Sequence, residues 1–291
     1  MAQTGQLAGR ASSGPLIGPV GLLRIGIVAF LVLAWEAAAY GGTLLKDVNP
    51  ALSTLLAQVT PSLLVIGRSL LELLAHPDLK WPIGIGSFSI ATDLMVPAFY
   101  WHLYVTVSEV VAAMIIGGTA GLLIGLVLGA NPFLSQAFER YLYYLGPTPK
   151  IVFFPVLILW FGVGVESKIA MGTISCFFPI VLSVASGMRQ IDRVLIRVGR
   201  SFRLNTWQMV TKIYLPAMRE PILNGVRLGM GVALIGTLLA ETRLSNKGIG
   251  FMIIDAYNTF DMPRMYAVLT VLFVVAIGAN ALVGRAGRSG R

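Results

Sequence analysis

The stretch VVAAMIIGGTAGLLIGLVLGA, residues 110–130, decides the fold, because it holds 21 consecutive residues without a charged side chain. About 20 such residues are enough for a helix to cross the hydrocarbon core of a bilayer. Two further uncharged runs, 169–188 and 265–284, hold 20 residues each. In the whole chain of 291 residues, 56% are hydrophobic and only 12% are charged, about half the charge of a soluble domain. The sequence therefore predicts an all-α integral membrane protein.

About six membrane-spanning helices are predicted from the apolar runs. The third run is interrupted by Gly146-Pro147-Thr148-Pro149 and by Pro155. A membrane helix tolerates such breaks where neighbouring helices cover the freed backbone groups. The predicted spans are residues 22–42, 105–130, 142–161, 168–188, 221–240 and 265–284.

Four glycines of residues 110–130 recur at intervals of four, which places them on one helix face. Without a Cβ atom on that face, a second helix can approach closely. The pattern predicts tight helix packing at Gly117, Gly121, Gly125 and Gly129.

Lysine and arginine gather between the predicted fourth and fifth spans. Residues 189–219 carry seven of them, and residues 285–291 carry three more. Such an excess marks the cytoplasmic side of membrane proteins. We therefore expect the gap 189–219 and both tails, residues 1–21 and 285–291, in the cytoplasm. The net charge of +9 then reflects membrane topology, and nucleic acid binding is rejected.

The segment 43–104 separates the first two spans and is expected on the periplasmic side. Its part SLLVIGRSLLELLAHPDLK, residues 62–80, has helical apolar spacing and predicts an amphipathic surface helix. The following part, WPIGIGSFSIATDLMVPAFYW, residues 81–101, is aromatic and punctuated by proline and glycine. We interpret this second part as an outer loop or a re-entrant segment.

Residues suited to catalysis or metal binding are few. The sequence contains no G-x-x-x-x-G-K-[ST] loop to cradle phosphate groups, and its only histidines, His76 and His102, lie outside the predicted spans. We expect no catalytic residue, no metal site and no enzyme activity. Glu36 and Glu241 are the ionisable groups nearest the apolar runs, and they either anchor neighbouring segments or mark a transport path.

The basic gap 189–219 predicts a helix–turn–helix elbow. Its first helix carries a stripe of arginines and, turned well away from it, a stripe of apolar residues. The arginines are Arg189, Arg193, Arg197 and Arg200, and the apolar residues are Val194, Leu195, Val198 and Phe202. Such a helix either lies on anionic lipid headgroups or docks its apolar side chains in a groove of a soluble partner.

The second helix of the elbow has start and stop signals of its own. Asn205 is a capping residue with Gln208 three residues later as its partner, and Leu215-Pro216 is expected to end the helix. Pro221 then lies in the first turn of the fifth span, where its missing N–H costs no hydrogen bond. The elbow is therefore expected to be stiff.

The basic gap resembles the coupling loop of bacterial ABC importer permeases, the inner-membrane subunits that work with a periplasmic binding protein. That family's signature is E-A-A, then Gly four residues after the last Ala, then I-x-L-P after nine more. Ile213, Leu215 and Pro216 fall in register with the second half of the signature. The positions of E-A-A are held by Arg197, Val198 and Gly199, and the position of Gly is held by Arg203.

The flanking sequence is similar to one branch of that family. Residues 146–192, 241–253 and 101–117 resemble the corresponding segments of nitrate, taurine and alkanesulfonate permeases and their aromatic-acid and thiamine-precursor relatives. The resemblance extends over roughly residues 101–284. It implies the permease subunit of an importer for a small anion of the sulfonate, nitrate or aromatic carboxylate type, or for a pyrimidine precursor. The alternative is a membrane scaffold or sensor that binds a cytoplasmic partner through the elbow without moving solute.

The resemblance also implies a set of partners. A second permease subunit, with a homodimer favoured over a heterodimer, frames one path with this chain. A cytoplasmic ATP-binding subunit hydrolyses ATP with Mg²⁺, and a periplasmic or lipid-anchored binding protein delivers the solute, so that this chain binds no cofactor. The residues implied in ATPase coupling are Arg197, Val198, Gly199, Phe202, Arg203, Trp207, Ile213, Leu215 and Pro216.

Two residues depart from the signature in a way that bears on the partner. Arg197 reverses the charge of the signature glutamate, so we expect acidic groups on the ATP-binding subunit near Arg197 and Arg203. Arg203 replaces a turn glycine, which suggests that no positive φ is required at this position.

Overall fold

The computed structural model describes residues 19–44, 49–76, 79–85 and 88–288, and it divides the chain into two units, residues 1–67 and 68–291. Within the described residues, five helices are long and apolar enough to cross a membrane, and a bent pair of helices could make a sixth span. The predicted all-α class with about six spans is thereby confirmed. Residues 1–18 and 289–291, which belong to the two predicted tails, lie outside the described residues.

The first unit consists of α1 (Pro19–Leu44), α2 (Pro50–Val59) and the start of α3 (Leu63–Ala75). Within this unit, Glu36 Oε1 accepts a hydrogen bond of 2.7 Å from the backbone N–H of Leu63. The indole N–H of Trp35 donates to the carbonyl of Pro61 at 3.0 Å. Two consecutive residues of α1 therefore hold the turn before α3, and Glu36 has anchoring contacts.

The segment after α3 is a β-hairpin and not the predicted loop or re-entrant segment. β1 (Leu79–Ile85) pairs antiparallel with β2 (Phe88–Val96), and the register shifts between Lys80 and Pro82. Isoleucine, phenylalanine and valine favour extended strands, whereas proline removes a ladder N–H and is confined to such irregular or edge positions. The glycines and prolines of the segment suggested irregular structure and hid this pattern.

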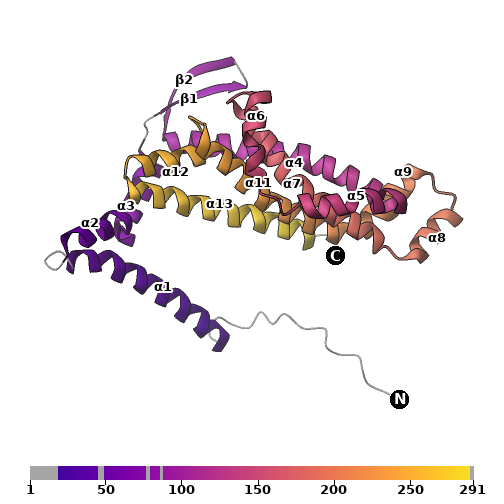
Figure 1. Cartoon of the computed structure of the whole chain (residues 1–291), viewed down its shortest axis with the longest axis horizontal. Helices are drawn as coiled ribbons and strands as arrows, with labels where there is room; N and C mark the ends of the chain where they lie inside the picture. The colour runs from indigo at the N-terminus through magenta and orange to yellow at the C-terminus, as the bar shows by residue number, and fades with distance from the viewer. Residues whose placement is uncertain (1–18, 45–48, 77–78, 86–87, 289–291) are drawn as a thin grey trace. The chain divides into compact units, whose positions relative to one another are not determined.

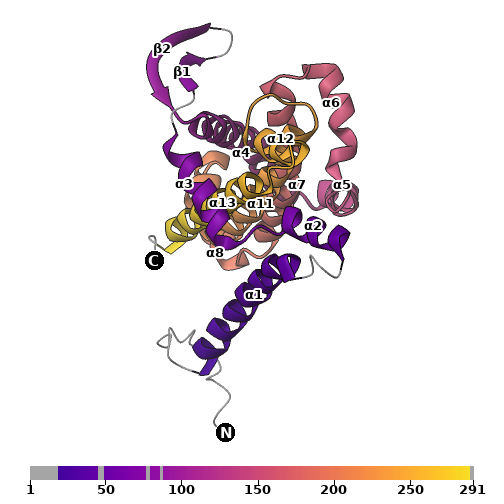
Figure 2. The ribbon, with the colours of Figure 1, turned by 90° about the vertical axis from the view of Figure 1, so that its left-hand side faces the viewer.

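The second unit is built on four long helices: α4 (Ala98–Ala130), α7 (Val165–Arg189), α11 (Arg219–Arg243) and α13 (Met262–Arg288). Each of the other three contacts α11, and Figure 2 shows the four side by side in a view along the bundle. α4 begins seven residues before the predicted start at residue 105, because the aromatic residues after Pro97 continue the helix.

The two ends of this bundle carry different short helices. α12 (Ile249–Asn258) lies at one end, while α8 (Arg193–Ser201) and α9 (Thr206–Met209) lie at the other end, as Figure 1 shows. If the basic gap is cytoplasmic, α12 belongs to the periplasmic end.

The predicted third span is broken at the predicted interruption, but its first half begins earlier than residue 142. α5 (Pro132–Leu145) is followed by η1 (Lys150–Phe153) and α6 (Phe154–Phe161), with a bend of 93° between the two halves. Proline lacks a backbone N–H and disfavours helix in the residue before it. The Gly146–Pro149 sequence therefore ends α5, and α6 stands across the bundle (Figure 1).

The row of glycines on α4 faces α7 along most of its length. A Cβ atom added at Gly117 would lie 2.5 Å from Cys176 Sγ, and one added at Gly125 would lie 2.7 Å from Val184 Cβ. Gly121 meets Ile180 and Gly129 meets Met188 in the same way. The contacts on α7 also recur every four residues, so the two helix faces match turn by turn.

Candidate functional site: the basic elbow and a buried polar cluster

The basic elbow begins with α8 and α9, and both helices have a side-chain cap. The carboxylate of Asp192 accepts from the N–H of Val194 at 2.8 Å. Asn205 Oδ1 accepts from the N–H of Gln208 at 2.8 Å, while Gln208 Oε1 accepts from the N–H of Asn205 at 3.1 Å. Side chains thus satisfy backbone donors that a helix start would otherwise leave without a partner.

Arg189 does not belong to the predicted arginine stripe. It ends α7, and its guanidinium binds both oxygens of Glu139 on α5 at 2.5 and 2.6 Å. Residues 190–192 interrupt the helix, so only Arg193, Arg197 and Arg200 share α8. The predicted stripe assumed one continuous helix, whereas a new helix begins after Asp192, the capping residue of α8.

The elbow presents large apolar side chains to its surroundings. Phe202 is 76% exposed and Trp207 is 73% exposed, and Val194, Leu195 and Val198 are exposed as well. Gly199 of α8 is buried, and a Cβ atom there would lie 2.5 Å from Met209 Sδ. Gly199 is therefore the point where the two arms of the elbow touch, and Val198 beside it points outward.

Arg203 adopts the left-handed conformation, with φ of 52°, which contradicts the expectation that no positive φ is required there. The N–H of Arg203 donates to Arg200 O at 2.9 Å, and the N–H of Leu204 donates to Gly199 O at 3.1 Å. This pair of bonds is a Schellman motif, which ends a helix through one left-handed residue, usually glycine. The turn of the signature is thus retained, and arginine occupies it at a steric cost.

The second arm ends close to Leu215-Pro216, as predicted. The π-helical turn η2 (Val210–Tyr214) leads into α10 (Leu215–Ala217), and the helical path breaks only at Met218, before α11. Pro216 follows the π-helical turn directly and lacks the N–H that would continue the helical hydrogen bonds at this position. Ile213 and Leu215 are half-buried, whereas Pro216 is exposed.

At the other end of the bundle, three side chains cap a helix to which none of them belongs. α12 begins after Gly248, which has a positive φ of 97° and no side chain for capping. Thr106 Oγ1 accepts from the N–H of Ile249 at 2.8 Å. Glu241 Oε2 accepts from the N–H of Gly250 at 2.6 Å, and His102 Nδ1 accepts from the N–H of Gly248 at 3.0 Å. α4 and α11 together therefore fix the start of α12.

Glu241 is the centre of this buried polar cluster. Its side chain is 0% exposed, and its Oε1 accepts a further bond of 2.7 Å from Thr106 Oγ1. A Cβ atom at Gly248 would collide with this carboxylate, so both the positive φ and the absence of a side chain suit the position. These contacts give Glu241 the anchoring role that was one of its two interpretations.

The sequence analysis missed Glu109 and Lys168, which complete the cluster. Glu109 is 1% exposed and lies one turn of α4 from Thr106, which binds Glu241, and Lys168, on α7, is also buried. A signal was present, because Glu109 and Ala113 continue the four-residue spacing of Gly117 and Gly121 toward the start of α4. A charged residue on a face built for close packing has to be buried.

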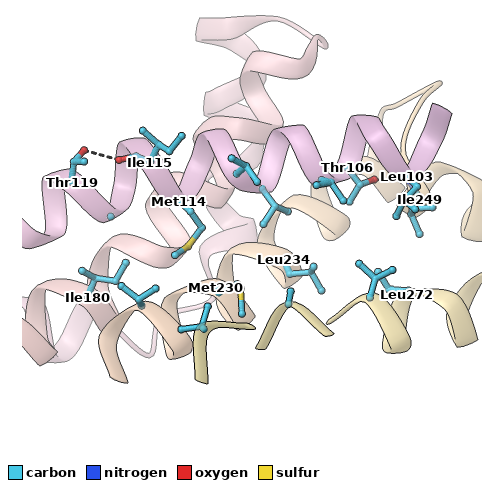
Figure 3. Close-up of a pocket in the computed structure, with 18 of the residues that line it drawn as sticks. Leu103, Thr106, Met114, Ile115, Thr119, Ile180, Met230, Leu234, Ile249 and Leu272 are labelled. Carbon is cyan, nitrogen blue, oxygen red and sulfur yellow. Dashed lines mark hydrogen bonds between the residues drawn. The ribbon is translucent and has the colours of Figure 1, made fainter. Parts of the chain in front are cut away.

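An apolar cavity of about 500 Å³ lies between α4, α11 and α13. Met114, Met230 and Leu234 are among the residues that line its middle (Figure 3). Thr106 and Ile249, which cap and begin α12, line one end, so the cavity reaches the polar cluster. Its wall offers almost no polar group that would hold an anion.

The family match lies within the second unit of the chain. Residues 117–288 match the family described as binding-protein-dependent transport system inner membrane component. The putative aliphatic sulfonates transport permease protein SsuC of Bacillus subtilis (strain 168) is 31% identical over 176 residues, which cover 60% of this chain and 64% of SsuC. The chain therefore spans slightly less than two thirds of this relative.

Two further relatives have related printed functions. The taurine transport system permease protein TauC of Escherichia coli (strain K12) is 26% identical over 188 residues, covering 63% of this chain and 68% of TauC. The nitrate import permease protein NrtB of Leptolyngbya laminosa is 25% identical over 202 residues, covering 66% and 72%.

A chain in an inward-facing structure of the MetNI methionine ABC transporter has a similar fold. The TM-score is 0.54 at 19% sequence identity, and the match covers 64% of this chain and 96% of that chain. At this identity the likeness concerns the fold alone.

Proposed function

Because the chain belongs to the family of binding-protein-dependent transport system inner membrane components, we propose that it is the membrane-spanning subunit of an ATP-driven importer. It is a multi-pass inner-membrane permease and not an enzyme. ATP and Mg²⁺ are used by a separate cytoplasmic subunit, a periplasmic or lipid-anchored protein delivers the solute, and a second copy of this chain completes the path. Both termini and the basic elbow then face the cytoplasm, and residues 43–104 lie on the periplasmic side.

The observation that carries this proposal is the exposure of Phe202 and Trp207 on a capped elbow beyond the end of the bundle. Large aromatic side chains that project from a polar, basic surface are typical anchors of a protein interface. Together with the family match, they support docking on a soluble partner. The elbow joins α7 to α11, so a force on it reaches both helices through the covalent chain.

Replacing Phe202 and Trp207 together by alanine tests the docking site. We expect the variant to lose co-purification with the ATP-binding subunit by at least about tenfold, since interface anchors each contribute about 2 kcal/mol or more. The matched control is Phe273→Ala, which removes a similarly exposed phenylalanine from α13, remote from the elbow. Equal retention of the partner by the double variant and the control would refute the docking site.

The basic side chains of the elbow make a second test. We expect Arg197→Glu to weaken binding of the ATP-binding subunit and ATP-dependent uptake, and a charge reversal on that subunit to restore both. The measurement is uptake into proteoliposomes by the variant and by the compensated pair. Unchanged uptake in Arg197→Glu would show that this residue faces water or lipid.

For the solute we propose a small anion of the sulfonate, nitrate or aromatic carboxylate type. Support comes from SsuC, TauC and NrtB, whose printed names concern sulfonates, taurine and nitrate. Thermal-shift measurements on the cognate binding protein identify the solute, because a ligand that binds only the folded state raises its melting temperature. ATP-dependent uptake of that compound is expected in proteoliposomes that hold all subunits. Uptake without the ATP-binding subunit would contradict the proposal, and no uptake at all would favour a scaffold or sensor.

A further inference from the structure

We propose that Glu109 and Glu241 form a proton-binding site, in which Glu109 is a neutral acid that donates a hydrogen bond to the Glu241 carboxylate. The bound proton joins α4 to α11 and fixes the start of α12. This inference concerns the end of the bundle opposite the basic elbow and does not depend on the proposed transport function.

Glu241 has the surroundings of the ionised partner. One of its oxygens accepts from the hydroxyl of Thr106 at 2.7 Å, and the other accepts from the N–H of Gly250 at 2.6 Å. The same hydroxyl oxygen accepts from the N–H of Ile249, so Thr106 links the Glu241 carboxylate to the start of α12. A carboxylate with donors on both oxygens is stabilised in its charged form.

Glu109 has the surroundings of the neutral partner. It is 1% exposed, and its Oε2 has no hydrogen-bond partner among the described residues. A buried charged oxygen without a donor is far more costly than the carbonyl oxygen of a neutral acid. Glu109 lies one turn of α4 from Thr106, which binds Glu241, and one turn from Ala113, which meets the same Cβ position of Gly172 as Thr237 of α11. Two buried carboxylates this close together repel each other, so one of the two holds a proton.

The charges around the pair lead to the same assignment. Lys168, 3% exposed, is the buried cation on α7, and its ammonium donates to Val163 O at 2.7 Å and to Gly164 O at 2.9 Å. Glu166, in the same helix turn, is exposed, and Lys247 lies in the loop before α12. One buried cation balances one buried carboxylate, and the second carboxyl group has to be neutral.

Separating the pair from this environment releases the proton. A glutamate in water is ionised at neutral pH, so the joined state holds one more proton than the separated state. A rise in pH therefore favours separation. Because Thr106 on α4 and Glu241 on α11 both bind the start of α12, separation of α4 from α11 removes one of these two anchors.

The test compares Glu109→Gln with Glu241→Gln in the full-length permease in lipid nanodiscs. Glutamine at residue 109 retains a donor toward Glu241, so we expect a melting temperature near that of the wild type. In Glu241→Gln, an NH2 group replaces one of the two accepting oxygens. This donor would then face another donor, either the N–H of Gly250 or the hydroxyl of Thr106. We expect Glu241→Gln to melt about 5–10 °C lower at every pH, as for a broken buried charged network.

The pH profile separates a proton site from a merely structural contact. The melting temperature of the wild type should fall from neutral to strongly alkaline pH, and this fall should be smaller in Glu109→Gln, which has no proton to lose. Lys168 and Lys247 are intact in Glu109→Gln, so a fall caused by their titration would persist in it. His102, which accepts from Gly248 as an uncharged imidazole, does not change charge over this range.

Glu166→Gln is the matched control, because it makes the same change at an exposed residue of α7 near the cluster. It should keep the pH profile of the wild type. Hydrogen exchange at Gly248–Gly250, compared between variants at one alkaline pH, should be faster in the wild type than in Glu109→Gln. Equal melting temperatures for Glu109→Gln and Glu241→Gln, or a pH profile of Glu109→Gln identical to that of the wild type, would overturn the proposal.

Discussion

At the scale of single residues, Arg203 shows how a side chain can occupy a position whose backbone suits glycine. Its φ of 52° lies in the left-handed region, which costs a non-glycine residue about 1–2 kcal/mol. Part of this cost is offset because glycine would lose more backbone entropy on folding. We therefore expect Arg203→Gly to stabilise the permease by up to about 1 kcal/mol and to raise its melting temperature by about 2–4 °C.

The control for this prediction is Arg200→Gly, three residues earlier in α8. There glycine enters a helix and should destabilise by about 1 kcal/mol. Both variants remove one exposed arginine, so charge alone would shift both melting temperatures in the same direction. A lower melting temperature for Arg203→Gly would show that the guanidinium makes a contact worth more than the backbone strain.

At the scale of helices, the contact between α4 and α7 depends on the absence of side chains. Alanine is usually a better helix residue than glycine by about 1 kcal/mol. At Gly125, however, a Cβ atom would lie 2.7 Å from Val184 Cβ and 2.9 Å from Val181 O. We expect Gly125→Ala to destabilise the permease by about 1–3 kcal/mol, measured as a lower melting temperature.

Gly118→Ala tests the direction of this effect on the same helix. Its Cβ atom would lie 3.7 Å from Ile180 Cδ1, an ordinary contact, so the helix propensity should dominate and the melting temperature should stay or rise. If Gly118→Ala and Gly125→Ala behaved alike, close packing would not be the property that glycine supplies at residue 125.

Several helical features were predictable because they depend on local spacing. The long apolar runs and the capping pair Asn205 and Gln208 require knowledge of only a few neighbouring residues. The stripe that included Arg189 was wrong, because spacing alone does not show that a helix ends between two members of a series. The direction of α6 after Pro149 was also not predictable, since proline shows where a helix ends and not where the chain goes next.

The buried polar cluster could not be predicted from local sequence, because it depends on contacts between distant segments. Glu109 and Glu241 are 132 positions apart in the sequence, and the four-residue spacing around Glu109 indicates burial without identifying its partner. Only the packing of α4 against α11 brings them together. The same is true of the bond between His102 and Gly248.

At the scale of the whole molecule, the basic elbow and the polar cluster lie at opposite ends of α11. The 25 residues of this helix extend over about 37 Å at a rise of about 1.5 Å per residue. Residues that are this far apart and share no partner contribute independently to stability. In the isolated permease, the losses of stability caused by Trp207→Ala and Glu241→Gln should therefore add to within about 0.5 kcal/mol in the double variant.

A double-mutant cycle of melting temperatures measures this independence. Gly125→Ala serves as the reference, because residue 125 lies in the contact between two long helices. We expect its loss of stability to depend on at least one of the substitutions Trp207→Ala and Glu241→Gln. A coupling well above about 0.5 kcal/mol between Trp207 and Glu241 would mean that the two ends share one cooperative packing arrangement even without partners.

The bend between α5 and α6 restricts what can surround the protein. Residues 146–149 are neither helix nor strand, and they lie beside the middle of α7, where the Lys150 ammonium stands 5.1 Å from the centre of the Phe178 ring. Irregular backbone at the depth of the hydrocarbon is tolerated only next to water or other protein. We therefore expect water or another protein subunit, and not fatty acyl chains, beside this flank.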